Sequence, residues 1–98
     1  MILAEVTFIP VDVGTSGSRY VKIALGIFKD EGISYYPNSM GTVLEDESMD
    51  RILDVIKKAE SEIIRNGVKR LETAIKIDHR VDVENSVSRK LKSIGVGN

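Results

Sequence analysis

The spacing of apolar and polar residues predicts a strand at the start of the chain, followed by a helix. Residues 2–9 (ILAEVTFI) alternate and are rich in residues that favour strands, and Pro10 ends the ladder. The alternation places Ala4, Val6 and Phe8 on one face and Leu3, Glu5, Thr7 and Ile9 on the other. Residues 19–30 then repeat at helical spacing, and Gly32 follows as a left-handed C-terminal cap. One face of this helix should carry Tyr20, Val21, Ala24, Leu25 and Phe28.

A hairpin and a second helix are expected next. Residues 33–36 and 40–45 read as two short strands around the turn Pro37-Asn38-Ser39. An acidic run and Ser48 then precede an apolar helical repeat, which Asn66-Gly67 closes. The members of this repeat are Met49, Ile52, Leu53, Ile56, Ala59 and Ile63.

The last third of the chain predicts one more strand and a terminal helix. Residues 68–78 (VKRLETAIKID) alternate, with Glu72, Ala74, Lys76 and Asp78 on one face. Val83, Val87, Leu91 and Ile94 recur at helical intervals, which predicts a helix over residues 83–94.

The resulting order of elements predicts a fold. β-α-β-β-α-β plus a terminal helix is typical of the ferredoxin-like α+β sandwich, with an antiparallel sheet and both main helices on one face. The 98 residues suffice for one domain over residues 1–98. The other sheet face would stay open, with charged side chains interleaved among apolar ones, which suits subunit packing or a ligand.

Composition narrows the possible functions. Fourteen basic and fifteen acidic residues give a net charge of -1, which argues against a general nucleic-acid binder. There is no apolar run long enough to span a membrane and no signal-peptide pattern, so a cytoplasmic protein is expected. With no cysteine and one histidine, His79, the sequence predicts neither a metal site nor a cofactor.

Two groups of residues are candidates for chemistry. Gly14-Thr15-Ser16-Gly17 precedes a helix, where Thr15, Ser16 and Ser18 could cap the helix or help bind an anion. Glu5 and Asp78 lie on strands, where a carboxylate can bind a cation or an amino-substituted ring, or can pair with Lys76 or Arg80. No catalytic motif accompanies His79, so no enzymatic activity is predicted.

Three segments of the chain together resemble a known family. AEVTFIPV followed by GTSGS, then MGTVLE, then IKIDHRVD, in this order and spacing, are similar to the YkoF-like thiamine-binding family of small ferredoxin-like domains. The resemblance covers nearly the whole chain. It implies a non-catalytic subunit that forms dimers, often paired into tetramers, and binds thiamine or a related pyrimidine.

The same resemblance suggests which residues contact the ligand. Carried over position by position, they are Glu5, Thr15, Ser16, Met40, Gly41, Thr42, Glu45, Lys76, Asp78 and Arg80. Glu45 could equally be a carboxylate at a helix N-terminus. Two other functions stay open: a structural or regulatory homo-oligomer without a ligand, and an enzyme that uses Glu5 or Asp78 as a general base.

Overall fold

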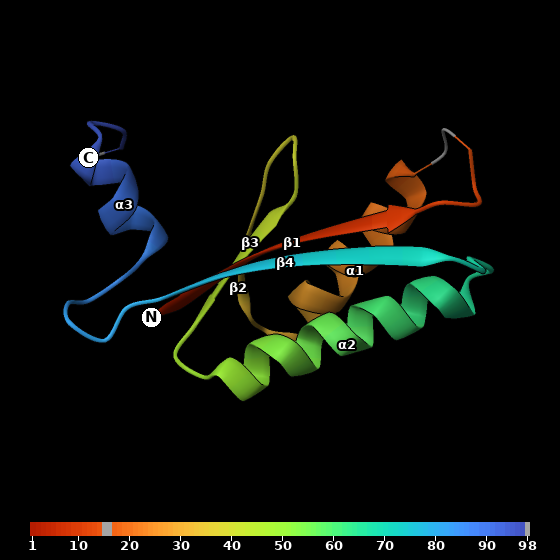
Figure 1. Cartoon of the computed structure of the whole chain (residues 1–98), viewed down its shortest axis with the longest axis horizontal. Helices are drawn as coiled ribbons and strands as arrows, with labels where there is room; N and C mark the ends of the chain where they lie inside the picture. Colours follow the sequence, from red (N-terminus) through yellow and green to blue (C-terminus); the bar gives the residue numbers. More distant parts are fainter. Residues whose placement is uncertain (15–16, 98) are drawn as a thin grey trace.

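The computed structural model, which describes residues 1–14 and 17–97, has the predicted order of elements (Figure 1). Four strands form one sheet in the order β2-β3-β1-β4, and every neighbouring pair is antiparallel. This is the ferredoxin-like arrangement. The elements are β1 (Ile2–Pro10), α1 (Ser18–Glu31), β2 (Ser34–Pro37), β3 (Thr42–Asp46), α2 (Met49–Arg65), β4 (Leu71–His79) and α3 (Val87–Ser93).

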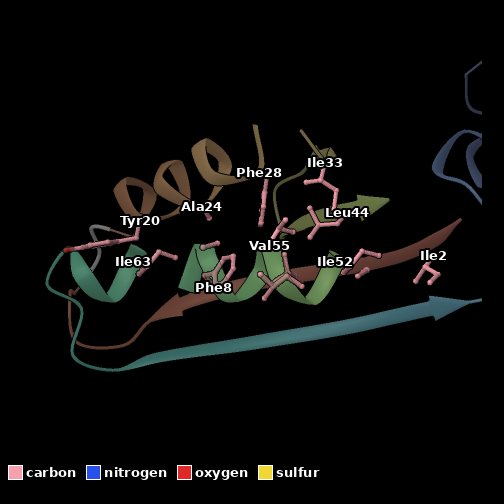
Figure 2. Close-up of a cluster of buried hydrophobic side chains, with 14 of the residues drawn as sticks. Ile2, Phe8, Tyr20, Ala24, Phe28, Ile33, Leu44, Ile52, Val55 and Ile63 are labelled. Carbon is pink, nitrogen blue, oxygen red and sulfur yellow. The ribbon is translucent and has the colours of Figure 1, made fainter. Parts of the chain in front are cut away.

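The core lies between the sheet and the pair formed by α1 and α2 (Figure 2). Ala4, Val6 and Phe8 of β1 face the helices as their alternation predicts, and all three are buried. Phe28 of α1 and Leu44 of β3 are completely buried against them. Because both helices use one face of the sheet, Glu5 and its neighbours at alternate positions lie on the open face.

Both helices bury a narrower stripe than the sequence predicts. Val21 of α1 and Leu53 of α2 were expected among the core residues, and both are exposed. A helix lying on a sheet buries the positions nearest the contact line, here Tyr20, Ala24 and Phe28 of α1. Apolar residues at the margin of the stripe therefore reach solvent.

The helix ends confirm some of the predicted caps and correct others. Gly32 ends α1 in the left-handed conformation, with φ of 71°. Ser48 caps α2 by accepting a hydrogen bond from the Arg51 backbone N–H at 3.2 Å. Ser18, however, is the first residue of α1 and not its cap, because Gly17 occupies that position. Thr15 and Ser16 lie outside the described residues.

Three predicted boundaries are wrong for local reasons. β3 begins at Thr42, because Met40 and Gly41 belong to a turn closed by the Asn38 side chain. β4 begins at Leu71, because the two preceding backbone N–H groups donate to the Asp12 carboxylate. α3 begins at Val87 instead of residue 83, because Ser86 caps it.

α3 lies apart from the two main helices, beyond the end of the sheet where β1 begins and β4 ends (Figure 1). Polar contacts hold its start to the sheet. The Glu45 carboxylate accepts a hydrogen bond of 2.7 Å from the Val87 backbone N–H, and Lys90 forms an ion pair with Asp78. The buried side-chain amide of Asn85 also donates to the Asp78 carbonyl. The position of α3 therefore depends on side chains of the open face.

We expect Ser48→Ala to destabilise the fold by about 1 kcal/mol, because it removes the acceptor that satisfies a free N–H at the start of α2. Urea unfolding followed by circular dichroism measures the change. Ser61→Ala is the control: this residue is exposed in the middle of the same helix, where alanine is the better helix former. The control should be neutral or slightly stabilising, and equal losses in both variants would contradict the capping role.

Candidate functional site

A shallow hollow of about 170 Å³ lies on the open face of the sheet, near the start of β1. Three strands and α3 contribute to it, and the sheet register explains how. Glu5 of β1 is opposite Val43 of β3 on one side and Lys76 of β4 on the other. Asp78 is the next residue of β4 on the same face. The lining residues are Leu3, Glu5, Val43, Lys76, Asp78 and Lys90.

Carboxylates surround the apolar floor of this open-face hollow. Leu3 is opposite Glu45 on β3 and Asp78 on β4, and Glu5 follows two residues later along β1. Leu3 is only 6% exposed although neither main helix covers it. The arrangement offers an apolar surface beside negative charge, which suits a flat organic cation.

Two of these carboxylates already have partners within the chain. Asp78 pairs with Lys90, and this hydrogen-bonded ammonium, although opposed by partial desolvation, lowers the pKa of the Asp78 carboxyl below its usual 3.8. Glu45 accepts the hydrogen bond from Val87. Glu45 therefore does act at a helix N-terminus, although the helix is α3 and not α2.

Glu5 differs from both. Within residues 1–14 and 17–97, none of the ion pairs or side-chain hydrogen bonds involves its carboxylate. Its side chain is half-buried. Glu5 is thus the carboxylate of the hollow that is available to a ligand.

A second hollow of about 240 Å³ lies beside the turn between β2 and β3. Val6 and Phe8 of β1 and Ala24 of α1 line this hollow together with the turn. Met40, Gly41 and Thr42 line this turn hollow, and the Thr42 side chain is buried. The Asn38 side chain accepts hydrogen bonds from the backbone N–H groups of Met40, at 2.8 Å, and Gly41, at 3.1 Å. It holds the turn in shape.

Gly41 lines the turn hollow and packs closely against β1. A Cβ atom at this position would lie 2.8 Å from the Thr7 hydroxyl oxygen, 3.0 Å from the Val6 carbonyl oxygen and 3.5 Å from Cγ of Glu5. The Thr7 hydroxyl also donates to the Met40 carbonyl oxygen at 3.1 Å. Only glycine permits this approach of the turn to β1. The MGT segment is therefore packed directly against the strand that carries Glu5.

The structure brings together most of the residues predicted for the site, but not all. Glu5, Lys76 and Asp78 share the open-face hollow with Glu45 at its margin, and the MGT residues form the neighbouring turn hollow. Arg80 is elsewhere: it lies past the end of β4, and its guanidinium pairs with Asp82 through two hydrogen bonds. Thr15 and Ser16 are outside the described residues.

Sequence reasoning missed three residues of this region. Asn38 was assigned to a turn, and its asparagine in a Pro-Asn-Ser segment is the signal that predicts side-chain closure of that turn. Thr7 was placed on the correct face without its contact to Met40. No pattern in the sequence could have paired Lys90 with Asp78, because α3 returns to the sheet through irregular chain.

A larger groove of about 390 Å³ lies between α1 and α2, away from the sheet. Its charged side chains are partly paired, since Lys58 contacts both Glu31 and Asp54. Side-chain hydrogen bonds to these two acids raise the pKa of Lys58, which keeps it charged. We assign no ligand to this groove.

Among residues 1–14 and 17–97, there is no group of three or more histidine, cysteine, aspartate or glutamate side chains placed to hold a metal ion. None of the described helices has the length and apolar character needed to cross a membrane.

Comparison with known proteins gives a consistent result across nearly the whole chain. The sequence model of the thiamine-binding protein family matches residues 4–95. The UPF0045 protein MJ1052 of Methanocaldococcus jannaschii is 46% identical over 94 residues, which cover 96% of this chain and 92% of that protein. The UPF0045 protein YqgV of Bacillus subtilis is 33% identical, over 96% of this chain and 94% of that one.

Solved structures agree on the fold. The crystal structure of the MJ1052 protein superposes with a TM-score of 0.88 and covers 96% of this chain and 95% of that one. A Thermotoga maritima protein, provisionally described as a thiamine biosynthesis/salvage protein, gives a TM-score of 0.82 at 16% identity. It covers 95% of this chain and 97% of that one, and at this identity the likeness concerns the fold alone.

We expect Gly41→Ala to destabilise the protein, since the Val6 carbonyl lies in the backbone of the central strand and cannot move away from the new methyl group. Thermal unfolding measures the effect. Gly26→Ala is the matched control, because a Cβ there meets nothing within 4 Å and the residue lies inside α1. The control should gain about 1 kcal/mol in helix stability. A Gly41→Ala variant as stable as the native protein would contradict the close approach.

We expect Lys90→Ala to raise the pKa of Asp78 towards 3.8, because the strongest cause of its depression is removed. The carbon-13 shift of the Asp78 carboxyl, followed by NMR against pH, reports this directly. A carboxyl pKa depressed by folding stabilises the native state above the usual value, and this contribution is lost as the pH falls through the folded value. Lys90→Ala should therefore lose stability at pH 7 more than at pH 3. Lys92→Ala, on the same helix, should leave the Asp78 titration unchanged.

Proposed function

The chain belongs to the family of thiamine-binding proteins, and from this membership we propose that it is a non-catalytic protein that binds thiamine or a related aminopyrimidine cation. The observation that carries the proposal is the open-face hollow. There, the Glu5 carboxylate, which pairs with none of the residues that the structure describes, lies beside the apolar side chains of Leu3 and Val43. The provisional description of the Thermotoga maritima protein is in keeping with the same class of ligand.

The chemistry of thiamine matches what the hollow offers. Thiamine is a cation with a flat aminopyrimidine ring, so it needs an apolar surface, a carboxylate and hydrogen-bond partners. Glu5 can accept a charge-assisted hydrogen bond from an exocyclic amino group or neutralise the positive ring. Because the hollow is shallow and solvated, this attraction should weaken as ionic strength rises.

The two hollows together suit such a ligand better than either one alone. Each is smaller than the roughly 300 Å³ at which pockets for drug-sized ligands begin. Gly41 of the turn hollow lies close to Thr7 and to Glu5, which lines the open-face hollow. We propose that the charged part of the ligand lies against Glu5 and that the MGT turn borders it.

A binding role is also favoured over catalysis. A general base works best with a pKa near the working pH. Asp78 has the opposite property, since Lys90 lowers its pKa. The enzyme alternative would therefore have to rest on Glu5 alone, and we propose no reaction for it.

Two further parts of the proposal concern the setting in which the protein acts. We propose that it self-associates, as the half-apolar open face and the family resemblance suggest, and that it acts in the cytoplasm. Light scattering at micromolar protein tests the first part, with a dimer or larger assembly as the expected result.

Glu5→Gln tests the ligand site, because it keeps the shape of the side chain and removes its charge. Thiamine affinity, measured by isothermal titration calorimetry, should fall by about 1.5–3 kcal/mol, the usual contribution of a hydrogen bond to a charged group. Far-ultraviolet circular dichroism confirms that the variant is folded.

The matched control is Glu72→Gln, which makes the same change on the same sheet face outside the hollow. Its affinity for thiamine should equal that of the native protein. Unchanged affinity in a folded Glu5→Gln variant would exclude Glu5 from the site. Native protein that gives no heat with thiamine at millimolar concentration would overturn the proposed function itself.

A further inference from the structure

The open-face hollow contains ammonium groups as well as carboxylates. Its lining includes Lys76 of β4 and Lys90 of α3, together with the carboxylates of Glu5 and Asp78. The hollow is therefore not simply acidic, because its charged side chains include both signs in equal number. A ligand that carries only a positive charge can use the carboxylates but gives the ammonium groups no partner.

One ammonium and one carboxylate of the hollow already neutralise each other. The Lys90 ammonium lies 2.5 Å from the Asp78 carboxylate. In the part of the chain that the structure describes, neither the Lys76 ammonium nor the Glu5 carboxylate takes part in an ion pair. The hollow therefore keeps one negative group, Glu5, and one positive group, Lys76, for a ligand.

The strand register holds these two groups next to each other. Glu5 and Lys76 are directly opposite on β1 and β4, and opposite residues on one sheet face have Cβ atoms about 4.5–5.5 Å apart. The next residues of β4 on this face are Ala74, which is uncharged, and Asp78, which pairs with Lys90. A cation bound at Glu5 therefore lies close to the Lys76 ammonium, and the two positive charges repel each other.

An anionic group on the ligand would remove this repulsion. The ligand's cation can then pair with Glu5 while its anion pairs with Lys76. The two side chains also differ in exposure, since Glu5 is half-buried and Lys76 is exposed. The cation and its ring therefore belong inside the hollow of about 170 Å³, and the anion belongs at its solvated rim.

We propose that the ligand of the open-face hollow is zwitterionic: an aminopyrimidine cation that also carries a phosphate ester, with the phosphate paired with Lys76. A phosphate monoester has a charge of about −1.5 to −2 at neutral pH and three strong acceptor oxygens. A lysine ammonium binds such a group as a compact point charge. The inference rests on the proposed function, because it names the chemical form of the same ligand. It makes Lys76 the residue that sets the preference for that form.

Isothermal titration calorimetry of the native protein with thiamine and with thiamine monophosphate tests the proposal. The two compounds share the same cation, so the comparison isolates the phosphate. The monophosphate should bind about tenfold more tightly at low salt, which corresponds to about 1.4 kcal/mol. High salt should reduce this difference, because Lys76 is exposed and its attraction for the phosphate is screened.

Lys76→Gln assigns the preference to a residue. Its affinity for the monophosphate should fall about tenfold, whereas its affinity for thiamine should stay the same or rise, because the repelling ammonium is gone. A structural defect would instead lower both affinities together. Lys76→Arg keeps the positive charge and should keep the preference for the monophosphate.

Lys22→Gln is the matched control. It makes the same change at an exposed lysine of α1, on the side of the sheet away from the hollow. Both affinities should equal those of the native protein. Far-ultraviolet circular dichroism confirms that all three variants are folded.

The outcomes separate this inference from the proposed function. A preference for the monophosphate that disappears in Lys76→Gln and remains in Lys76→Arg supports it. Equal binding of the two compounds by the native protein, or tighter binding of thiamine, overturns the zwitterionic ligand while thiamine binding stands. A preference that persists in Lys76→Gln overturns the role of Lys76. A native protein that binds neither compound at millimolar concentration overturns the proposed function, and this inference with it.

Discussion

The alternation of side chains along β1 is the constraint on which the rest of the structure depends. β1 pairs with β4 along its whole length and with β3 over residues 2–6. Its even-numbered residues contact α1 and α2, and its odd-numbered residues form the floor and walls of the open face. A shift by one residue would place Glu5 in the core and Val6 in the hollow, and an unpaired buried carboxylate is too costly to persist. The packing of the helices therefore also fixes the position of the candidate ligand group.

The elements with strong periodicity could be predicted from the sequence, and so could the face on which Glu5, Lys76 and Asp78 lie. α2 was predicted well because its apolar repeat, its Ser48 cap and its closing Asn66-Gly67 all agree. The predicted element boundaries are wrong where a side chain distant in sequence hydrogen-bonds to backbone groups, as the Asp12 carboxylate does before β4. Such contacts join residues far apart in sequence, and no local pattern contains them. For the same reason, the sequence did not predict that Asp78 pairs with Lys90 or that Arg80 lies outside the hollow.

The candidate site combines side chains on paired strands with one side chain from a separate helix. Glu5, Lys76 and Val43 lie on paired strands, so their backbone positions are fixed by the ladder. The MGT turn is held by Asn38 and by its close contact with β1 at Gly41. Lys90, in contrast, reaches the hollow from α3, which polar contacts connect to the sheet. A ligand would therefore meet a floor fixed by strand pairing and one lysine supplied by α3.

The attachment of α3 has a consequence for occupancy of the hollow. Lys90 is a cation belonging to the chain itself, and it already neutralises Asp78. Any external cation that binds Asp78 must displace this ammonium, so the chain carries its own competitor. Thermodynamic linkage makes the effect reciprocal. The free energy that the Lys90–Asp78 ion pair contributes is subtracted from the binding free energy of such a cation, and the bound cation weakens the attachment of α3 by the same amount. A cation that binds Glu5 alone avoids this competition and leaves the C-terminal helix in place.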